Sequence, residues 1–235
     1  MKKSGFFIII LLVIVAVSCK KNTEHKPVNI VKSDSYLPLT TGSNWKYISV
    51  YTGITDTVTV KMTGDSIYNT SNRFFYYTAI ITSATNGNQT EYFRTDVTSY
   101  PDVTEHVYFI RSQNFIYNIP TNIIGTFNVA MGDDNMQVGQ SRADKLTDNG
   151  LVSGFFAQYA DTLKEKNITK IVNGKTFTNV MHSHVALQLH AGLNYSDRMS
   201  FDFYLAKGVG MIEMDSYDNL NHFSGVETII DYNIK

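Results

Sequence analysis

The chain has 235 residues, with 20 lysine and arginine residues against 21 aspartate and glutamate residues, and a formal net charge of -1. This balance argues against a nucleic-acid partner, because proteins that bind phosphate backbones usually carry a basic stripe and none is visible. Cys19 is the single cysteine, which excludes an intrachain disulfide and a cysteine-based zinc site. The length is sufficient for one large β domain with a substantial core, the simplest domain organisation.

The start of the chain has the features of an export signal. Lys2 and Lys3 are basic, residues 6–17 form an unbroken apolar run, and Ala16, Val17 and Ser18 are small or apolar before Cys19. The apolar run would span about 18 Å as a helix, well short of a bilayer core. We therefore predict a cleaved signal peptide over residues 1–18. An ordinary signal with a cysteine near the cut by accident is the alternative.

Residues 1–19 resemble the signals of bacterial lipoproteins, with Ala16 where leucine is commonest. The resemblance implies that the Cys19 thiol is acylated, for example with palmitate, and anchors the protein to a membrane. In similar lipoproteins an acidic cluster after the cysteine can mark export to the cell surface, whereas Lys20 and Lys21 follow it here. We expect a cell-envelope protein on the outer or inner membrane that faces the periplasm.

Strand patterns begin after a polar tether at residues 19–35, which contains Pro27. In Thr57–Thr63, valine and methionine alternate with threonine and lysine, as in a half-buried strand. Arg73–Thr82 is aromatic and β-branched on both faces, which predicts a central strand that is covered on both sides. Further predicted strands are Trp45–Thr52, Glu91–Arg94, Glu105–Arg111, Asn114–Asn118, Phe155–Leu163, Ile168–Val172, a long run from Lys175, Met199–Ala206, Met211–Tyr217 and Val226–Asn233.

Two Asn-Gly pairs, Asn86-Gly87 and Asn173-Gly174, predict hairpin turns, because this dipeptide readily adopts the positive φ angles of a type I′ turn. Residues 121–154 lack sustained periodicity, and we expect a long excursion there, with one short helix near Arg142–Leu146. The chain as a whole predicts an all-β domain over residues 36–235. We expect an antiparallel meander of about ten strands, curled into a barrel or half-barrel.

Two short motifs resemble those of uncharacterised bacterial envelope lipoproteins. The first is Pro38-Leu39-Thr40-Thr41-Gly42-Ser43-Asn44-Trp45-Lys46-Tyr47, and the second is Tyr204-Leu205-Ala206-Lys207-Gly208-Val209-Gly210. Gly42 would allow a tight turn into the first strand, and Trp45 and Tyr47 would share one face. Gly208 and Gly210 would form a tight hairpin or bulge, a structural role. The resemblance extends at fold level to the curved sheets of the carriers LolA and LolB, whose concave face accepts acyl chains.

The strongest metal or catalytic candidates are His182, His184 and His190, which share the polar face of one strand. His190 would lie about 20 Å from His184, so only His182 and His184 could share an ion, with a third ligand from another strand. We treat this pair as a weak metal candidate and interpret Asp133-Asp134-Asn135 as a solvated turn. We predict no cofactor and no enzymatic activity, with a hydrolase of dispersed site residues as the alternative.

Aromatic residues are the side chains of this protein best suited to binding an apolar ligand. Most should fill the core, but a curled sheet has more concave apolar surface than its own chain can cover. We expect a non-enzymatic protein that holds a lipid or other amphiphilic ligand in this concavity. The candidate lining residues are Phe75, Tyr77, Tyr92, Tyr108 and Phe203. The alternative is a structural or accessory subunit that meets an envelope protein partner.

Overall fold

A computed structural model describes residues 35–69, 74–85, 87–98, 104–112, 126–146, 150–152, 155–191 and 193–235. The predicted signal, Cys19, most of the tether and the predicted strand Asn114–Asn118 lie outside these residues. None of the described segments forms a helix long and apolar enough to cross a membrane.

The described residues form thirteen strands and no helix. The strands are β1 (Asn44–Tyr51), β2 (Ile54–Asn69), β3 (Phe74–Ser83), β4 (Gly87–Thr98), β5 (Thr104–Ser112), β6 (Thr126–Asp133), β7 (Ser141–Lys145), β8 (Leu151–Val152), β9 (Phe155–Val172), β10 (Lys175–Ala191), β11 (Asn194–Ala206), β12 (Gly210–Tyr217) and β13 (Phe223–Asn233).

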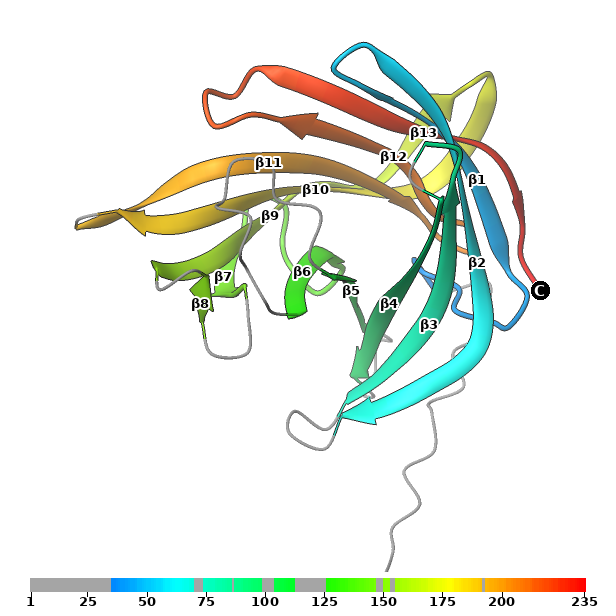
Figure 1. Cartoon of the computed structure of the whole chain (residues 1–235), viewed down its shortest axis with the longest axis horizontal. Coiled ribbons are helices and arrows are strands. Elements are labelled where there is room, and N and C mark those ends of the chain that lie inside the picture. Colours follow the sequence, from blue (N-terminus) through cyan, green and yellow to red (C-terminus); the bar gives the residue numbers. More distant parts are fainter. Residues whose placement is uncertain are drawn as a thin grey trace, which may run out of the picture.

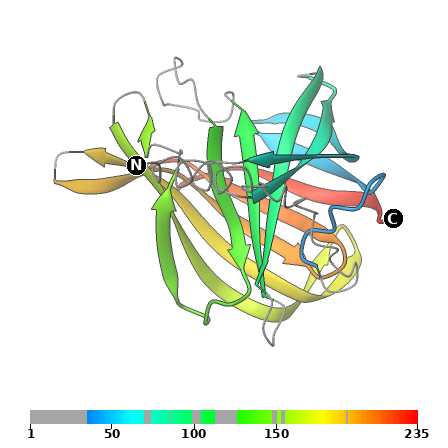
Figure 2. The same ribbon diagram turned by 90° about the horizontal axis from the view of Figure 1, so that it is seen from below.

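One antiparallel sheet contains these strands in the order β6-β5-β4-β3-β2-β1-β13-β12-β11-β10-β9-β7, and β8 pairs with β9 outside this path. Figure 1 shows that the sheet is strongly curved and stays open, and Figure 2 shows the same concavity from below. The predicted all-β class and half-barrel are confirmed. Strand β1 pairs with β13, so the first and last strands of the domain lie side by side at the middle of the strand order.

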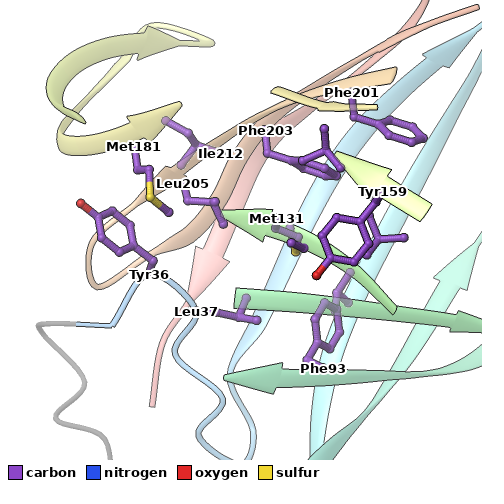
Figure 3. Close-up of a cluster of buried hydrophobic side chains, with 14 of the residues drawn as sticks. Tyr36, Leu37, Phe93, Met131, Tyr159, Met181, Phe201, Phe203, Leu205 and Ile212 are labelled. Carbon is purple, nitrogen blue, oxygen red and sulfur yellow. The ribbon is translucent and has the colours of Figure 1, made fainter. Parts of the chain in front are cut away.

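The edge strand β6 packs across the concave face of the opposite half of the sheet. A Cβ atom added at Gly132 in β6 would lie 2.5 Å from Met181 Cε and 2.9 Å from Ser183 Oγ, both on β10, and 3.3 Å from Leu205 Cδ1 on β11. Figure 3 shows the core between these two halves, with Phe93, Met131, Tyr159 and Phe203 pointing into one space. The glycine allows this close approach because it has no side chain.

Arg142 lies in a strand and not in the short helix that we expected near residues 142–146. Strand β7 pairs with β9, with Arg142 opposite Asp161. The side chain of Arg142 forms ion pairs with Asp161 and with Asp133 at the end of β6. A segment of this length forms a marginal helix on its own, and the strand pairing and ion pairs decide its conformation.

Strand β3 is covered on one face and not on both, contrary to the prediction for Arg73–Thr82. Ala79 and Ile81 are buried, whereas Ile80 between them is 41% exposed. The strand is the fourth in the sheet order, between β2 and β4, and one face points to solvent. Apolar residues on both faces therefore did not indicate burial on both faces here.

Hairpins are present at both predicted positions, and Asn173-Gly174 forms the turn of one of them. Asn173 and Gly174 have φ angles of 48° and 76° and connect β9 to β10, as a type I′ turn requires. Gly87 already pairs with Ser83 as the first residue of β4, so the turn between β3 and β4 lies before it. Both predicted hairpins are present.

The two sequence motifs meet in space. Gly42 has a φ of 81°, and the buried Trp45 and Tyr47 point to the turn between β11 and β12. The Trp45 indole N–H donates to the carbonyl of Val209 at 2.5 Å, and the Tyr47 hydroxyl donates to the carbonyl of Met211 at 3.0 Å. Gly208 has a φ of 71° and Gly210 one of 108°, which fits the expected tight hairpin.

Candidate functional site

The histidine face of β10 forms a polar cluster with its neighbours on β9 and β11. In register, His182 lies between Glu165 on β9 and Tyr204 on β11, and His184 lies between Thr162 and Asp202. The intervening Ser183 is buried in the core, so the histidines are on the opposite, convex face. The period of two along each strand places these polar groups side by side.

One carboxylate oxygen of Asp202 lies close to both histidines and forms a hydrogen bond with His184. His184 Nδ1 lies 2.9 Å from Asp202 Oδ1 and His182 Nε2 lies 3.2 Å from it, while His182 Nδ1 lies 3.0 Å from Glu165 Oε2. Because a neutral imidazole carries one N–H and both ring nitrogens of His182 face carboxylates, this arrangement favours the imidazolium form.

The electrostatics of the cluster agree with this geometry. Burial disfavours the charged forms, but the hydrogen bonds and charges exchanged between the groups outweigh it. They raise the pKa of His182 above its usual value and lower the pKa of Asp202 well below its usual range. Both shifts favour the charged forms, an ionised Asp202 beside a protonated His182.

Tyr204 connects the cluster to β9 and β12 through its contact with Lys170. Its ring stacks on His182, with centroids 4.3 Å apart and planes at 19°, and Lys170 Nζ lies 3.5 Å from the centroid. Two groups at these distances cannot share one face of the ring, so Tyr204 lies between them. Lys170 also forms an ion pair with Glu213 at 2.8 Å. Cation–π contacts of this kind contribute about 0.5–2 kcal/mol each.

Beside the cluster is an open hollow of about 340 Å³, which we call the polar hollow. Its lining residues are Lys164, Glu165, His182, His184, Asp202, Tyr217 and Asn221. Burial and then the charges of Asp202 and Asp215 raise the pKa of Tyr217 to about 12, so its hydroxyl stays protonated. The hollow thus combines carboxylates, a lysine, two imidazoles, an amide and an aromatic ring.

The structure brings the two metal candidates together but engages both with carboxylates. His182 and His184 converge on Asp202, and no group of three histidine, cysteine or acidic side chains in the described part of the chain is arranged to hold a metal ion. His190, the third histidine, lies further along β10 and contacts the rings of Phe156 and Tyr195. The metal site stays a weak prediction.

Asp133-Asp134-Asn135 forms a turn, but it is not the solvated turn that we expected. Asp133 and Asp134 are 4% and 7% exposed, and Arg142 bridges Asp133 at 2.8 Å and the fully buried Asp161 at 3.4 Å. Burial, opposed by the charge of Arg142, raises the pKa of Asp161 to about 6. The arginine comes from a strand that the sequence did not reveal, and it allows the carboxylates to be buried.

The five predicted ligand-lining residues are distributed over four strands. Phe203 is 4% exposed and packs on Phe201, with ring centroids 5.7 Å apart. Tyr77 is half-buried against the core, next in register to the buried Phe93, and burial raises its pKa. The side chains of the other three, Phe75, Tyr92 and Tyr108, lie outside the described part, although their backbones are in β3, β4 and β5.

Exposed apolar side chains gather at the end of the β10–β11 hairpin. Leu193 is 95% exposed, Phe155 55%, Phe156 58% and Tyr195 40%. Phe156 and Tyr195 pack edge-on against the ring of His190, at centroid distances of 6.2 and 5.2 Å. We call Phe155, Phe156, His190, Leu193 and Tyr195 the projecting tip. Residues 194–199 of β11 extend past the end of β12, as Figure 1 shows.

Comparisons with known proteins give fold-level likeness only. No family model matches the chain, and no curated protein matches it. A crystal structure from Bacteroides fragilis, described as a candidate exported protein with a YmcC-like fold, is similar with a TM-score of 0.49 and 9% identity. Another, described as a candidate lipoprotein from Parabacteroides distasonis, has a TM-score of 0.43 and 14% identity. Each match covers 85% of this chain and 99% of the other.

The sequence pattern indicated the histidines but not the residues around them. Glu165, Asp202 and Tyr217 come from three other strands, and only the register of the sheet brings them to His182 and His184. A signal was available for Asp202, since alternation within Met199–Ala206 places it on the polar face with Tyr204. The strand order was needed to connect that face to β10.

Proposed function

We propose that this protein is a lipid-anchored, non-enzymatic protein of the cell envelope that works by binding a protein partner at the projecting tip. The observation that carries the proposal is the cluster of exposed apolar side chains at the tip, with Leu193 95% exposed. Soluble proteins rarely expose such clusters without a binding role, and aromatic residues are enriched at interfaces. The envelope location is inferred from the signal, which resembles those of lipoproteins, and the periplasm-facing side from Lys20 and Lys21, which stand where an acidic cluster can mark export to the surface.

The tip and the tether lie at opposite ends of β11. Ser35 is the last residue of the tether and the first described residue, and its carbonyl accepts a hydrogen bond at 2.7 Å from the N–H of Gly208, just beyond the C-terminal end of β11. The tip lies at the N-terminal end of that strand, about 40 Å away at ~3.3 Å per residue. The tip is therefore remote from the point at which the chain leads to Cys19, and it stays accessible to a partner in a protein held through that residue.

The absence of catalysis in this proposal is supported by the surroundings of the histidines. A hydrolase with a dispersed site would need a nucleophile hydrogen bonded to a histidine. The hydroxyl nearest to His184 in register is that of Thr162, and it bonds instead to Ser141 Oγ at 2.7 Å. We therefore assign His184 and Asp202 to the electrostatic cluster and not to a catalytic site.

Photo-crosslinking in cells tests the partner site. A photoreactive phenylalanine analogue at Leu193 should give one discrete product of higher mass, and Phe156→Ser in the same chain should reduce that product at least about fivefold. The control position is Thr178, which is exposed near the other end of β10. Equal crosslinking from positions 178 and 193, or none from either, would contradict the partner site.

The anchor is tested separately. Cys19→Ala should move the protein from the membrane fraction to the soluble fraction and abolish incorporation of labelled palmitate. Stable attachment requires two or more acyl chains, at about 0.8 kcal/mol per buried CH₂. Retention of the variant in the membrane would show that the anchor is elsewhere.

A ligand in the concavity is the second candidate, and Tyr77 favours it. This residue is half-buried beside the core cluster, so part of its ring remains available next to Phe93. An unlabelled fatty acid should displace a fluorescent fatty acid from the delipidated protein in a saturable manner. Tyr77→Ala should weaken the binding of the fluorescent fatty acid. No displacement, together with a crosslinked partner at the tip, would favour the first candidate.

A further inference from the structure

The polar hollow lies on the convex face, apart from both the projecting tip and the concave core. Its walls are held in place by contacts between the lining residues: Asp202 Oδ1 lies close to His182 Nε2 and His184 Nδ1, and Glu165 Oε2 lies close to His182 Nδ1. The side chains of His182 and Asp202 are only 14% and 17% exposed. The hollow is therefore prearranged, which lowers the entropic cost of binding.

The charges around the hollow disfavour an ionic ligand of either sign. An anion such as phosphate would face Glu165 and Asp202, with Glu213 and Asp215 on the neighbouring strand. A cation would face Lys164, with Lys170 nearby and with His182, whose protonation the carboxylates favour. Since each sign of charge meets repulsion as well as attraction, a neutral ligand fits best.

The groups that remain available are suited to hydroxyls. A hydroxyl both donates and accepts hydrogen bonds. Lys164 offers donors, the exposed carboxylate of Glu165 offers acceptors and the side-chain amide of Asn221 offers both. His184 uses Nδ1 for Asp202, and Nε2 makes no hydrogen bond to another described residue.

The half-buried ring of Tyr217 completes the site with an apolar surface. Pyranose rings present C–H groups on one face and hydroxyls at the edge, so they pack on aromatic rings while their hydroxyls form hydrogen bonds. We propose that the polar hollow binds a neutral saccharide, with Tyr217 packing on the sugar ring and Lys164, Glu165 and Asn221 binding its hydroxyls. The volume of about 340 Å³ is at the lower end for small-molecule sites and suits one or two sugar residues.

NMR titration of the soluble Cys19→Ala protein tests this inference. The probes are maltotriose, cellotriose and chitotriose, with inorganic phosphate and Zn²⁺ as ionic probes. At least one trisaccharide should saturate the shifts of the His184 ring and the Tyr217 amide, with a Kd of about 0.1–10 mM, corresponding to roughly 3–5 kcal/mol. Failure of all three to saturate at these two residues would overturn the proposal, as would tighter saturation there by phosphate or Zn²⁺.

Variants separate direct contact from a change in folding. Asn221 has a φ of 63°, so Asn221→Gly removes the amide while keeping a residue that adopts this angle easily. It should weaken the best trisaccharide at least about fivefold, and Lys164→Ala should weaken it further. Asn219→Gly changes an exposed residue of the same turn that does not line the hollow and should leave the Kd unchanged. Equal affinity in Asn221→Gly, Lys164→Ala and the parent would refute the assigned contacts.

Discussion

Trp45 and Val209 are 164 positions apart in the chain and are joined by a hydrogen bond from the indole Nε1–H to the main-chain carbonyl. The contact connects β1 to the turn between β11 and β12, and a Cβ atom added at Gly210 would lie 3.1 Å from the same indole nitrogen. Tyr47 makes the parallel contact to Met211. The two sequence motifs therefore form one structural unit that holds the start of the domain against a hairpin near its end.

Trp45→Phe should destabilise the protein. The substitution removes the indole N–H, so the carbonyl of Val209 loses this hydrogen bond. The expected cost is about 1–3 kcal/mol in the free energy of unfolding. Urea unfolding of the Cys19→Ala protein measures the change. Tyr47→Phe should cost about 1 kcal/mol, and the double variant should be non-additive because both side chains hold one turn. Unchanged unfolding midpoints would show that these bonds do not contribute.

Gly132→Ala should destabilise the contact between the two halves of the sheet. The added Cβ would clash with Met181 Cε and Ser183 Oγ, so side chains in a packed core would have to move, at about 1–3 kcal/mol. Ser183→Ala should be neutral or stabilising alone, because its buried hydroxyl has no hydrogen-bond partner among the described residues.

The double variant gives the internal control for this contact. Ser183→Ala removes one of the atoms that the new Cβ would meet, so it should recover part of the stability lost in Gly132→Ala. Strictly additive effects in thermal or urea unfolding would argue that β6 does not pack on β10 at this position.

Asp161→Asn should change how stability depends on pH. The folded-state pKa of Asp161 is raised to about 6 from an unfolded value near 4, so the folded protein holds the proton more tightly. The contribution of Asp161 to stability is therefore present at low pH and lost as pH rises from about 4 to about 6, by roughly 3 kcal/mol at most. The asparagine variant should lack this loss.

Unfolding free energies at pH 4 and pH 7, compared between parent and variant, measure the effect of Asp161. The control is Asp144→Asn, an exposed carboxylate on the same strand β7 as Arg142. A difference between parent and Asp161→Asn that is the same at both pH values would contradict the assignment.

Asp202→Asn should lower the pKa of His182. In the parent, the carboxylates outweigh burial and the pKa is raised, so the stabilisation from His182 is present below about pH 6.5 and lost as pH rises through the folded-state value. Without the charge of Asp202, burial should dominate. An NMR titration of the histidine ring signals against pH measures the change. An unaltered pKa of His182 would show that a group other than Asp202 raises it.

Glu165→Gln provides the graded comparison. Its side chain is 52% exposed, against 17% for Asp202, so solvent screens its charge more strongly. The pKa of His182 should fall less in this variant than in Asp202→Asn. A larger fall in Glu165→Gln would reverse the order of the two carboxylates.

The local patterns of the chain determined the strands and several of their faces. Val60 and Met62 are buried as their alternation predicted, and Met181, Val185, Leu187 and Leu189 are buried opposite the histidines. Asn173-Gly174 forms its turn because the φ angles depend on the dipeptide itself. These features follow from interactions between residues close in sequence, which a single sequence records. The signal and Cys19 likewise rest on local residues, and they remain predictions.

Only the tertiary structure decided which distant segments meet. The strand at Arg142, the burial of Asp133 and Asp161, and the convergence of Glu165, His182, His184 and Asp202 all depend on strand order and register. Neither can be read from periodicity, because the same alternation is compatible with many pairings. The sequence thus determined an all-β chain with a polar histidine face, whereas long-range pairing turned that face into a hollow and left Leu193 exposed at a projecting tip.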